Sequence, residues 1–120
     1  MPKYVDGYVI PIPTRNLPAY RKMASVACKV WIEHGALEYH ECVGEDLKVP
    51  FGMTFPKGMK LKKGDTVVFA WVVYKSRAHR DRVNAKVMKD PRLGALMSAG
   101  AMPFDAKRMM FGGFKSFVDG

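Results

Sequence analysis

The sequence predicts an α+β domain in which two helices pack on one face of a four-stranded antiparallel sheet. Residues 67–74 are apolar without interruption, a pattern typical of a strand that is covered on both faces. Residues 17–34 and 75–90 read as helices, and strand-like segments flank each of them. The order is therefore strand, helix, strand, an irregular insert, and again strand, helix, strand. This repeated order is the ferredoxin-like βαββαβ plan, and residues 1–120 are expected to form a single domain.

The first strand and the first helix have clear boundaries in the sequence. A strand is expected from residue 4 to about residue 10, where Pro11 and Pro13 would stop its hydrogen bonding. A helix is expected over residues 17–34, with Asn16 as its N-cap. The apolar stripe of this helix has helical spacing and consists of Tyr20, Ala24, Ala27 and Trp31.

The remaining elements follow in the order that the fold class requires. They are a strand at 36–43, an insert at about 44–64, a strand at 65–74, a helix at 75–90, a Pro- and Gly-marked stretch at 90–103 and a last strand near 107–118. The insert carries apolar side chains on a loop that is long for a compact domain. It is either a lid over a pocket or an arm that grips a second subunit, and its aromatic side chains slightly favour the arm.

Composition places the chain among intracellular globular proteins. Apolar residues make up 48% and aromatic residues 12% of the sequence, as in a protein with a packed core. The longest apolar run is far short of a membrane span, and the first residues lack the pattern of a secretory signal. Cys28 and Cys42 have no metal-binding or redox spacing. We therefore expect a reduced setting, with the cytoplasm as the default location and no membrane partner.

The net charge of +9 raises the possibility of nucleic-acid binding, but the pattern of the charges weakens it. Residues 75–92 hold seven basic and two acidic side chains, and a second basic cluster lies at 57–63. Most of these side chains are expected on the solvent side of a helix or in a loop. No zinc-finger spacing, RNA-recognition signature or clear helix-turn-helix accompanies them. Nucleic acid is therefore an unlikely partner.

The apolar strands predict a homodimer. Two helices cover one face of the sheet, whereas the strand at 67–74 needs cover on both faces. The last strand adds further apolar side chains, namely Met109, Met110, Phe111, Phe114 and Phe117. A second copy of the chain, packed sheet against sheet, is the simplest cover for such a large apolar patch. The expected assembly is a dimeric α/β barrel.

Several segments of the chain resemble a known family. The resemblance is carried by the sequences at residues 4–7, 34–43, 67–81, 83–88 and 102–109. These segments are similar to the YbaA-like family, a bacterial family of uncharacterised proteins, and the likeness covers nearly the whole chain. It implies a ferredoxin-like subunit of the dimeric α/β-barrel superfamily and brings no established activity. The superfamily includes cofactor-free monooxygenases, lactone isomerases and haem-binding proteins, so the fold by itself says little about function.

The second helix carries the first set of candidate site residues. Arg80 and Asn84 share one helix face with Val83 and Val87, on the stripe that should pack on the sheet. Arg80 offers a planar fork for an anion, and Asn84 can donate and accept hydrogen bonds. Arg77 and His79 lie near this stripe and are further candidates. Arg77 would bind a ligand, and His79 would transfer a proton. The alternative is that Arg80 pairs with an internal acid and Asn84 caps backbone groups.

The second strand carries the other set. Glu38, His40 and Cys42 share one face, so that His40 beside Cys42 could activate a thiolate or contact a ligand. Cys42 is more simply a small buried apolar side chain. Glu41 lies on the opposite face among apolar neighbours. Its pKa would be raised there unless Arg80 or another cation meets it, which makes Glu41 a general-acid candidate.

Three further features have less specific readings. Asp6 shares a strand face with Tyr4 and Tyr8. It would either belong to a buried hydrogen-bonded network or be a charge that discourages pairing at the edge of the sheet. Trp31, Tyr20 and Trp71 could stack on a flat ligand or belong to the core. The histidines His34, His40 and His79 lie on three different elements, so no metal site is expected, and no cofactor motif is present.

These observations predict a cytoplasmic homodimer of unestablished function. We expect a small anionic or polar-aromatic ligand between sheet and helices, with binding residues Arg80, Asn84, Arg77, Trp31 and His40 and with Glu41 or His79 as the proton carrier of any reaction. One alternative is a cofactor-independent oxygenase or isomerase, and another is a non-catalytic scaffold dimer. Whether the protein is an enzyme stays open at this point.

Overall fold

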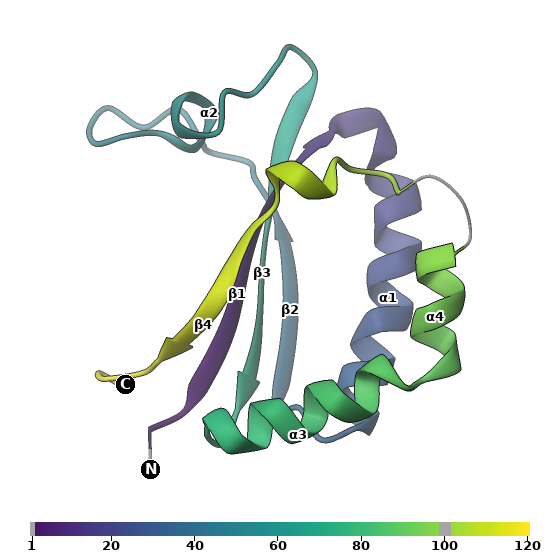
Figure 1. Ribbon diagram of the computed structural model, residues 1–120. Helices are drawn as coiled ribbons and strands as arrows, with labels where there is room; N and C mark the ends of the chain where they lie inside the picture. The colour runs from purple at the N-terminus through teal and green to yellow at the C-terminus, as the bar shows by residue number, and fades with distance from the viewer. Residues whose placement is uncertain (1, 99–101) are drawn as a thin grey trace.

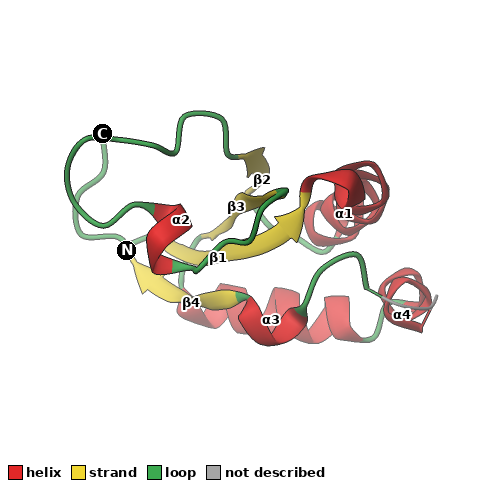
Figure 2. Ribbon diagram, turned by 90° about the horizontal axis from the view of Figure 1, so that it is seen from above, coloured by secondary structure: helices red, strands yellow, loops and turns green. Residues whose placement is uncertain are grey.

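The computed structural model describes residues 2–98 and 102–120, and it has the predicted ferredoxin-like topology. A four-stranded antiparallel sheet of order β2-β3-β1-β4 has α1, α3 and α4 on one face (Figures 1 and 2). The strands are β1 (Tyr4–Pro13), β2 (Glu38–Val43), β3 (Asp65–Tyr74) and β4 (Met110–Lys115). The helices are α1 (Leu17–Glu33), α2 (Phe55–Gly58), α3 (Arg77–Met88) and α4 (Pro91–Ser98), with 3-10 turns at Thr14–Asn16 and Ala106–Arg108.

Strand β1 is longer than predicted, because both of its prolines lie inside it. Pro11 pairs with Val67 and Pro13 with Asp65 on β3. On its other side β1 pairs with β4 only as far as Val9. Beyond that residue β1 is an edge, where a missing N–H interrupts no hydrogen bonding with a neighbouring strand.

The core lies between the sheet and the helices. Its first buried cluster consists of Ile10, Ile12, Tyr20, Ala24, Val68 and Ala70. The second consists of Val30, Ala36, Val72, Tyr74, Val83 and Val87. Each fully buried aliphatic side chain contributes roughly 1.5–3 kcal/mol relative to an exposed one. The predicted inward face of the second helix is confirmed for Val83 and Val87, which are both buried on α3.

The opposite face of the sheet is open around Phe69 in the single chain, although Val67 and Val73 on the same face of β3 are buried. Phe69 on β3 is 46% exposed, and Met110 and Phe114 on β4 are 54% and 62% exposed. Figure 2 shows α1, α3 and α4 together on one side of the sheet, away from this surface. We call these side chains, with Trp71 beside them, the open face.

The Pro- and Gly-marked stretch at 90–103, in which no helix was predicted, contains helix α4. A side chain of Asp90 accepts a hydrogen bond from the backbone N–H of Arg92 at 2.9 Å, and Pro91 occupies the first helical position. An acidic cap followed by proline is a helix-start signal that was present in the sequence. Residues 99–101 of this stretch lie outside the described residues. Strand β4 also begins later than predicted, after the turn at Ala106–Arg108.

The start of α4 is tied to the end of α1 by charged side chains. Asp90 Oδ2 lies 2.9 Å from His34 Nε2 and 2.8 Å from Arg92, which also contacts Glu33. Hydrogen bonds from Arg92 and His34 hold the pKa of the Asp90 carboxyl well below its usual range. The folded state therefore favours the ionised form of Asp90.

This arrangement predicts how stability depends on pH. Since the folded pKa of Asp90 is depressed, its contribution is complete above the ordinary value of 3.8 and is lost as the pH falls through the folded pKa. We expect Asp90→Asn to lower stability at neutral pH and to make urea unfolding less sensitive to acid below about pH 4. Asp46→Asn, in the exposed part of the insert, is the control and should leave the acid dependence unchanged. An unchanged acid dependence in Asp90→Asn would contradict this account.

The insert at 44–64 is irregular as predicted, apart from the short helix α2. It begins near the upper end of the sheet in Figure 1 and extends away from α1 and α4. Arg108 donates a hydrogen bond to the carbonyl of Met59 at 2.8 Å, which anchors one side of the insert. Phe51, by contrast, is 81% exposed. In the described part of the chain, no helix has both the length and the hydropathy to cross a bilayer.

Candidate functional site

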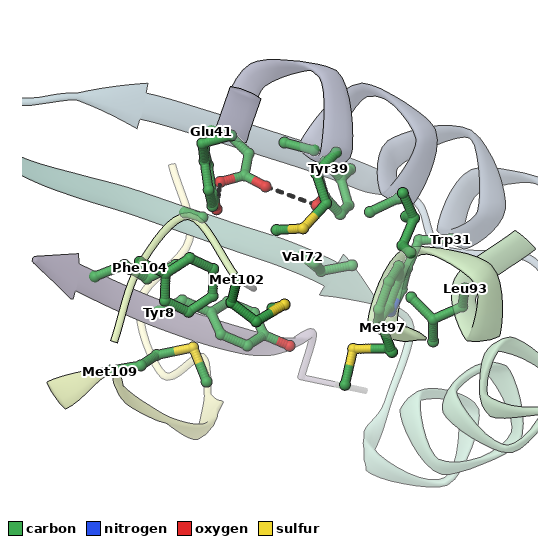
Figure 3. Close-up of a pocket in the computed structure, with 17 residues that line it drawn as sticks. Tyr8, Trp31, Tyr39, Glu41, Val72, Leu93, Met97, Met102, Phe104 and Met109 are labelled. Atoms are coloured by element: carbon green, nitrogen blue, oxygen red, sulfur yellow. Dashed lines mark hydrogen bonds between the residues drawn. The ribbon is translucent and has the colours of Figure 1, made fainter. Parts of the chain in front are cut away.

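A cavity of about 160 Å³ lies between the helix-covered face of the sheet and helices α1 and α4. Figure 3 shows side chains from the strands, from both helices and from the segment before β4 around it. The described lining is almost entirely apolar or aromatic and includes Tyr8, Trp31, Val72, Leu93, Met97 and Phe104. An apolar cavity of roughly 150 Å³ is large enough to bind benzene. The cavity is therefore of a size for one aromatic ring.

Glu41 is the one charged side chain among the described residues that line the cavity. Tyr20 on α1 donates a hydrogen bond to Glu41 Oε1 at 2.5 Å, and Tyr39 on β2 donates one to Oε2 at 2.7 Å. Figure 3 shows Glu41 and Tyr39 joined in this way at one end of the cavity. Burial and the neighbouring Glu41 raise the pKa values of both tyrosines, which keeps them protonated as donors. The partners that the sequence could not supply for Glu41 are thus two hydroxyl groups and not a cation.

The polar side chains of α3 belong to a separate network around Asp6. Asp6 on β1 is 3% exposed, and Arg80 approaches its Oδ1 at 2.9 Å, while the Asn84 amide lies 3.5 Å from its Oδ2. Asn84 Oδ1 accepts hydrogen bonds from Trp31 Nε1 at 3.1 Å and from the Tyr74 hydroxyl at 3.2 Å. We call these five residues the Asp6 network. Burial raises the pKa of Asp6, and the guanidinium of Arg80 opposes that rise.

The Asp6 network decides between two readings of the sequence. Arg80 pairs with an internal acid, as the alternative reading proposed, and neither Arg80 nor Asn84 lies among the described lining residues of the cavity. Asn84 binds side chains and not the backbone groups that were expected. Asp6 is a buried network residue on an inner strand, so the edge-charge reading is wrong.

The other predicted site residues lie in different places. Trp31 lines the cavity and also joins the Asp6 network. His79 accepts a hydrogen bond from the backbone N–H of Lys75 at 3.0 Å, and burial together with Lys75 and Arg82 lowers its pKa. Arg77 is exposed at the start of α3. Neither Arg77 nor His79 is in the described lining of the cavity.

His40 lies on the open face of the sheet, away from the cavity. Its Nε2 is 3.0 Å from Glu38 Oε1, and its ring stacks on Trp71 with centroids 4.8 Å apart. Cys42, two residues further along β2, is exposed, so its reading as a small buried side chain is wrong for the single chain. The reason is that β2 is an edge strand whose outer face no helix covers.

Apart from Trp31 and Tyr20, the aromatic and sulfur-containing side chains that shape the cavity were not predicted as site residues from the sequence. Tyr8, Tyr20 and Tyr39 all line it, and burial raises the pKa of Tyr8 to about 12. Tyr39 and Glu41 are two residues apart on one strand face, a spacing that could have paired them. Methionines from α4 and from the segment before β4 contribute Met97, Met102 and Met109. In the ranges 2–98 and 102–120, no group of side chains is arranged to hold a metal ion.

Together these features define a ferredoxin-like α+β protein with an apolar cavity between its sheet and its helices. The chain belongs to the family described as "Protein of unknown function (DUF1428)", whose model matches residues 3–106. It is 43% identical over 119 residues to the uncharacterized protein YbaA of Escherichia coli, covering 98% of both chains. The YbaA protein of Shigella flexneri matches to the same extent. The resemblance to the YbaA-like family is confirmed.

Two solved structures confirm the fold class. One is a NIPSNAP family protein of unknown function from Agrobacterium tumefaciens, with a TM-score of 0.63 and 14% identity over 95% of this chain and 87% of the other. The second is a dimeric ferredoxin-like protein from an uncultured marine organism, with a TM-score of 0.53 and 16% identity over 98% of this chain and 96% of the other. At such identities the likeness concerns the fold alone. The function of the family is unknown, and none of these relatives supplies a catalytic activity.

Proposed function

We propose that this protein acts as a homodimer in which each subunit binds a small, mostly apolar molecule in the cavity between sheet and helices. The observation that supports this most is a cavity of about 160 Å³ with apolar walls and one carboxyl group, that of Glu41. Arg80, which was expected to hold an anion, pairs with Asp6 instead, and Arg77 lies outside the described lining of the cavity. A neutral aromatic molecule therefore fits the site better than an anion does, because Glu41 offers an anion no attraction.

The open face supports the dimer. Phe69, Met110 and Phe114 are each between 46% and 62% exposed on one sheet face, and a second copy would remove them from water. The marine structural neighbour is described as dimeric. The exposed Phe51 of the insert fits an arm that grips the partner, and the described lining of the cavity includes no residue of the insert that would make it a lid. Free thiols at Cys28 and Cys42 fit the proposed cytoplasmic location.

Benzene binding tests the cavity directly. We expect benzene at ten times its dissociation constant to stabilise the protein against urea by roughly 1.4 kcal/mol through mass action. Ala27→Leu, which fills the cavity from α1, should abolish this gain. Ala19→Leu places the same side chain on an exposed position of the same helix and should preserve it. If saturating benzene leaves the wild-type unfolding curve in place, the binding function is wrong.

A cofactor-independent isomerase or oxygenase is the second candidate. The observation that favours it is the position of Glu41, which lines the cavity while two tyrosines hold its carboxyl in one orientation. Glu41 would carry the proton, whereas His79 lies outside the described lining. Glu41→Gln should then remove turnover while benzene binding persists. A scaffold dimer without a ligand site would bind no benzene at all.

A further inference from the structure

A groove of about 1130 Å³ lies between α1 and β2. Its walls include Leu17, Arg21, Val26, Cys28, Val43 and Val68. β2 is the edge strand of the sheet at this side, bonded only to β3. The groove is thus bounded by one helix and by a strand with a free edge.

The groove and the cavity share four side chains. Tyr20, Ala24, Tyr39 and Glu41 line both spaces. These residues, which we call the partition, therefore separate the cavity from the groove.

Hydrogen bonds to one carboxyl group hold the polar part of the partition. Tyr20 reaches Glu41 from α1 at 2.5 Å, and Tyr39 reaches it from β2 at 2.7 Å. Glu41 is half-buried, and a half-exposed side chain changes rotamer far faster than a buried core residue can be displaced. Tyr39 is half-buried as well, so rotation of the Tyr39 and Glu41 side chains can open the groove side while Tyr20 and Ala24 stay packed in the core.

The carboxyl of Glu41 also has unused capacity. A carboxylate has about four lone-pair positions, and the two tyrosines occupy two of them. Trp31 Nε1, by contrast, already donates to Tyr74 and to Asn84, and Glu41 is the one charged acceptor in the described lining. A hydrogen-bond donor on a bound ring would therefore find its acceptor at Glu41.

We infer that cavity and groove are two chambers of one site, entered through the groove, and that Glu41 at their junction selects aromatic molecules that carry a hydroxyl or amino donor. This inference rests on the proposed binding function and specifies its ligand class. The ring lies in the inner cavity, and the donor group binds Glu41. The partition opens as the ligand passes and closes behind it.

A comparison of phenol with benzene tests the selection. In the wild-type protein phenol should bind about tenfold more tightly, since a hydrogen bond to a charged acceptor outweighs the cost of burying the hydroxyl. In Glu41→Leu the order should reverse, and Glu41→Gln, which keeps an acceptor oxygen, should retain part of the preference. Isothermal titration of the purified full chain gives the dissociation constants. Equal affinities of phenol and benzene in the wild type would overturn the selection.

The rate of ligand exchange tests the entrance. Ser25→Trp places a bulky ring in the groove without touching the cavity. Association and dissociation of phenol, measured by NMR exchange, should both slow by about the same factor while the dissociation constant stays constant. Ala19→Trp, outside the groove on the same helix, is the control. Unchanged exchange rates in Ser25→Trp would show that the groove is not the entrance.

The two tests distinguish this inference from the proposed function. If benzene binds but either test fails, only this inference is wrong. If no ligand binds at all, the proposed function is wrong as well.

Discussion

Replacement of Arg80 by methionine is expected to lower the free energy of unfolding by about 3 kcal/mol. Loss of one partner from a buried ion pair costs roughly 3–5 kcal/mol, because the other charge stays behind without compensation. Asp6 is that remaining charge, and its side chain is 4% exposed. The 19% exposure of the Arg80 side chain places the expected effect at the lower end of the range. Urea unfolding at neutral pH measures it.

Two controls separate the ion pair from general effects of substitution. Arg82→Met removes an exposed charge from the same helix and should change stability by less than about 0.5 kcal/mol. Asp6→Asn combined with Arg80→Met removes both charges and should recover much of the loss. Because Arg80 holds down the pKa of Asp6, the defect of Arg80→Met should also shrink as acid neutralises Asp6.

The same substitution revises an expectation from the sequence. If Arg80 and Asn84 only filled an apolar site, the double change Arg80→Met with Asn84→Leu would be tolerated. Both residues contact Asp6 in the structure, so the double change leaves a buried carboxyl without either partner. We therefore expect a marked loss of stability. Tolerance equal to that of Arg82→Met would return Arg80 and Asn84 to the role of ligand-binding residues.

Phe69→Asp is expected to convert the proposed dimer into a folded monomer. Phe69 lies on β3, an inner strand of the sheet, and would be buried near the centre of a sheet-to-sheet interface. A central aromatic anchor contributes at least 2 kcal/mol, and a buried unpaired charge adds a further penalty. Dimer affinity should fall by more than about 100-fold. Since Phe69 is 46% exposed in the single chain, the monomer itself should remain folded.

Native mass spectrometry at graded concentrations measures this change. Met88→Asp, on the far side of the molecule at the end of α3, removes an exposed apolar side chain outside the open face and should leave the dimer intact. A wild-type monomer at all concentrations would contradict sheet-to-sheet packing. A dimer that persists in Phe69→Asp would place the interface elsewhere.

The fold was predictable because its strongest signals are local. The apolar run of β3, the stripe of α1 and the inward valines of α3 all follow from the periodicity of single segments. The predicted boundaries were wrong where the pairing of a neighbouring strand decides whether a residue is tolerated inside a strand. Pro11 reads as a strand end, yet it is tolerated because β4 stops pairing at Val9. Helix α4 was missed although its start signal, Asp90 followed by Pro91, was present.

The candidate site was less predictable because its contacts join distant parts of the chain. Periodicity placed Arg80 and Asn84 on an inward face, but Asp6, the partner of Arg80, lies 74 positions away. Glu41 was correctly singled out as an unusual carboxyl, whereas its contact with Tyr20 depends on how α1 crosses β2. No pattern within one segment specifies such a crossing.

The sequence by itself determined the βαββαβ order, the inward faces of its helices and the surplus of apolar side chains on which the proposed dimer rests. These features depend on the spacing of residues within single segments, which can be read directly from the sequence. Only the tertiary structure decided that the polar residues of α3 serve Asp6, and that Glu41 borders a cavity of about 160 Å³. A cavity is the volume that packed side chains leave unfilled. It therefore arises from the relative positions of α1, α4 and the sheet, and from no segment alone.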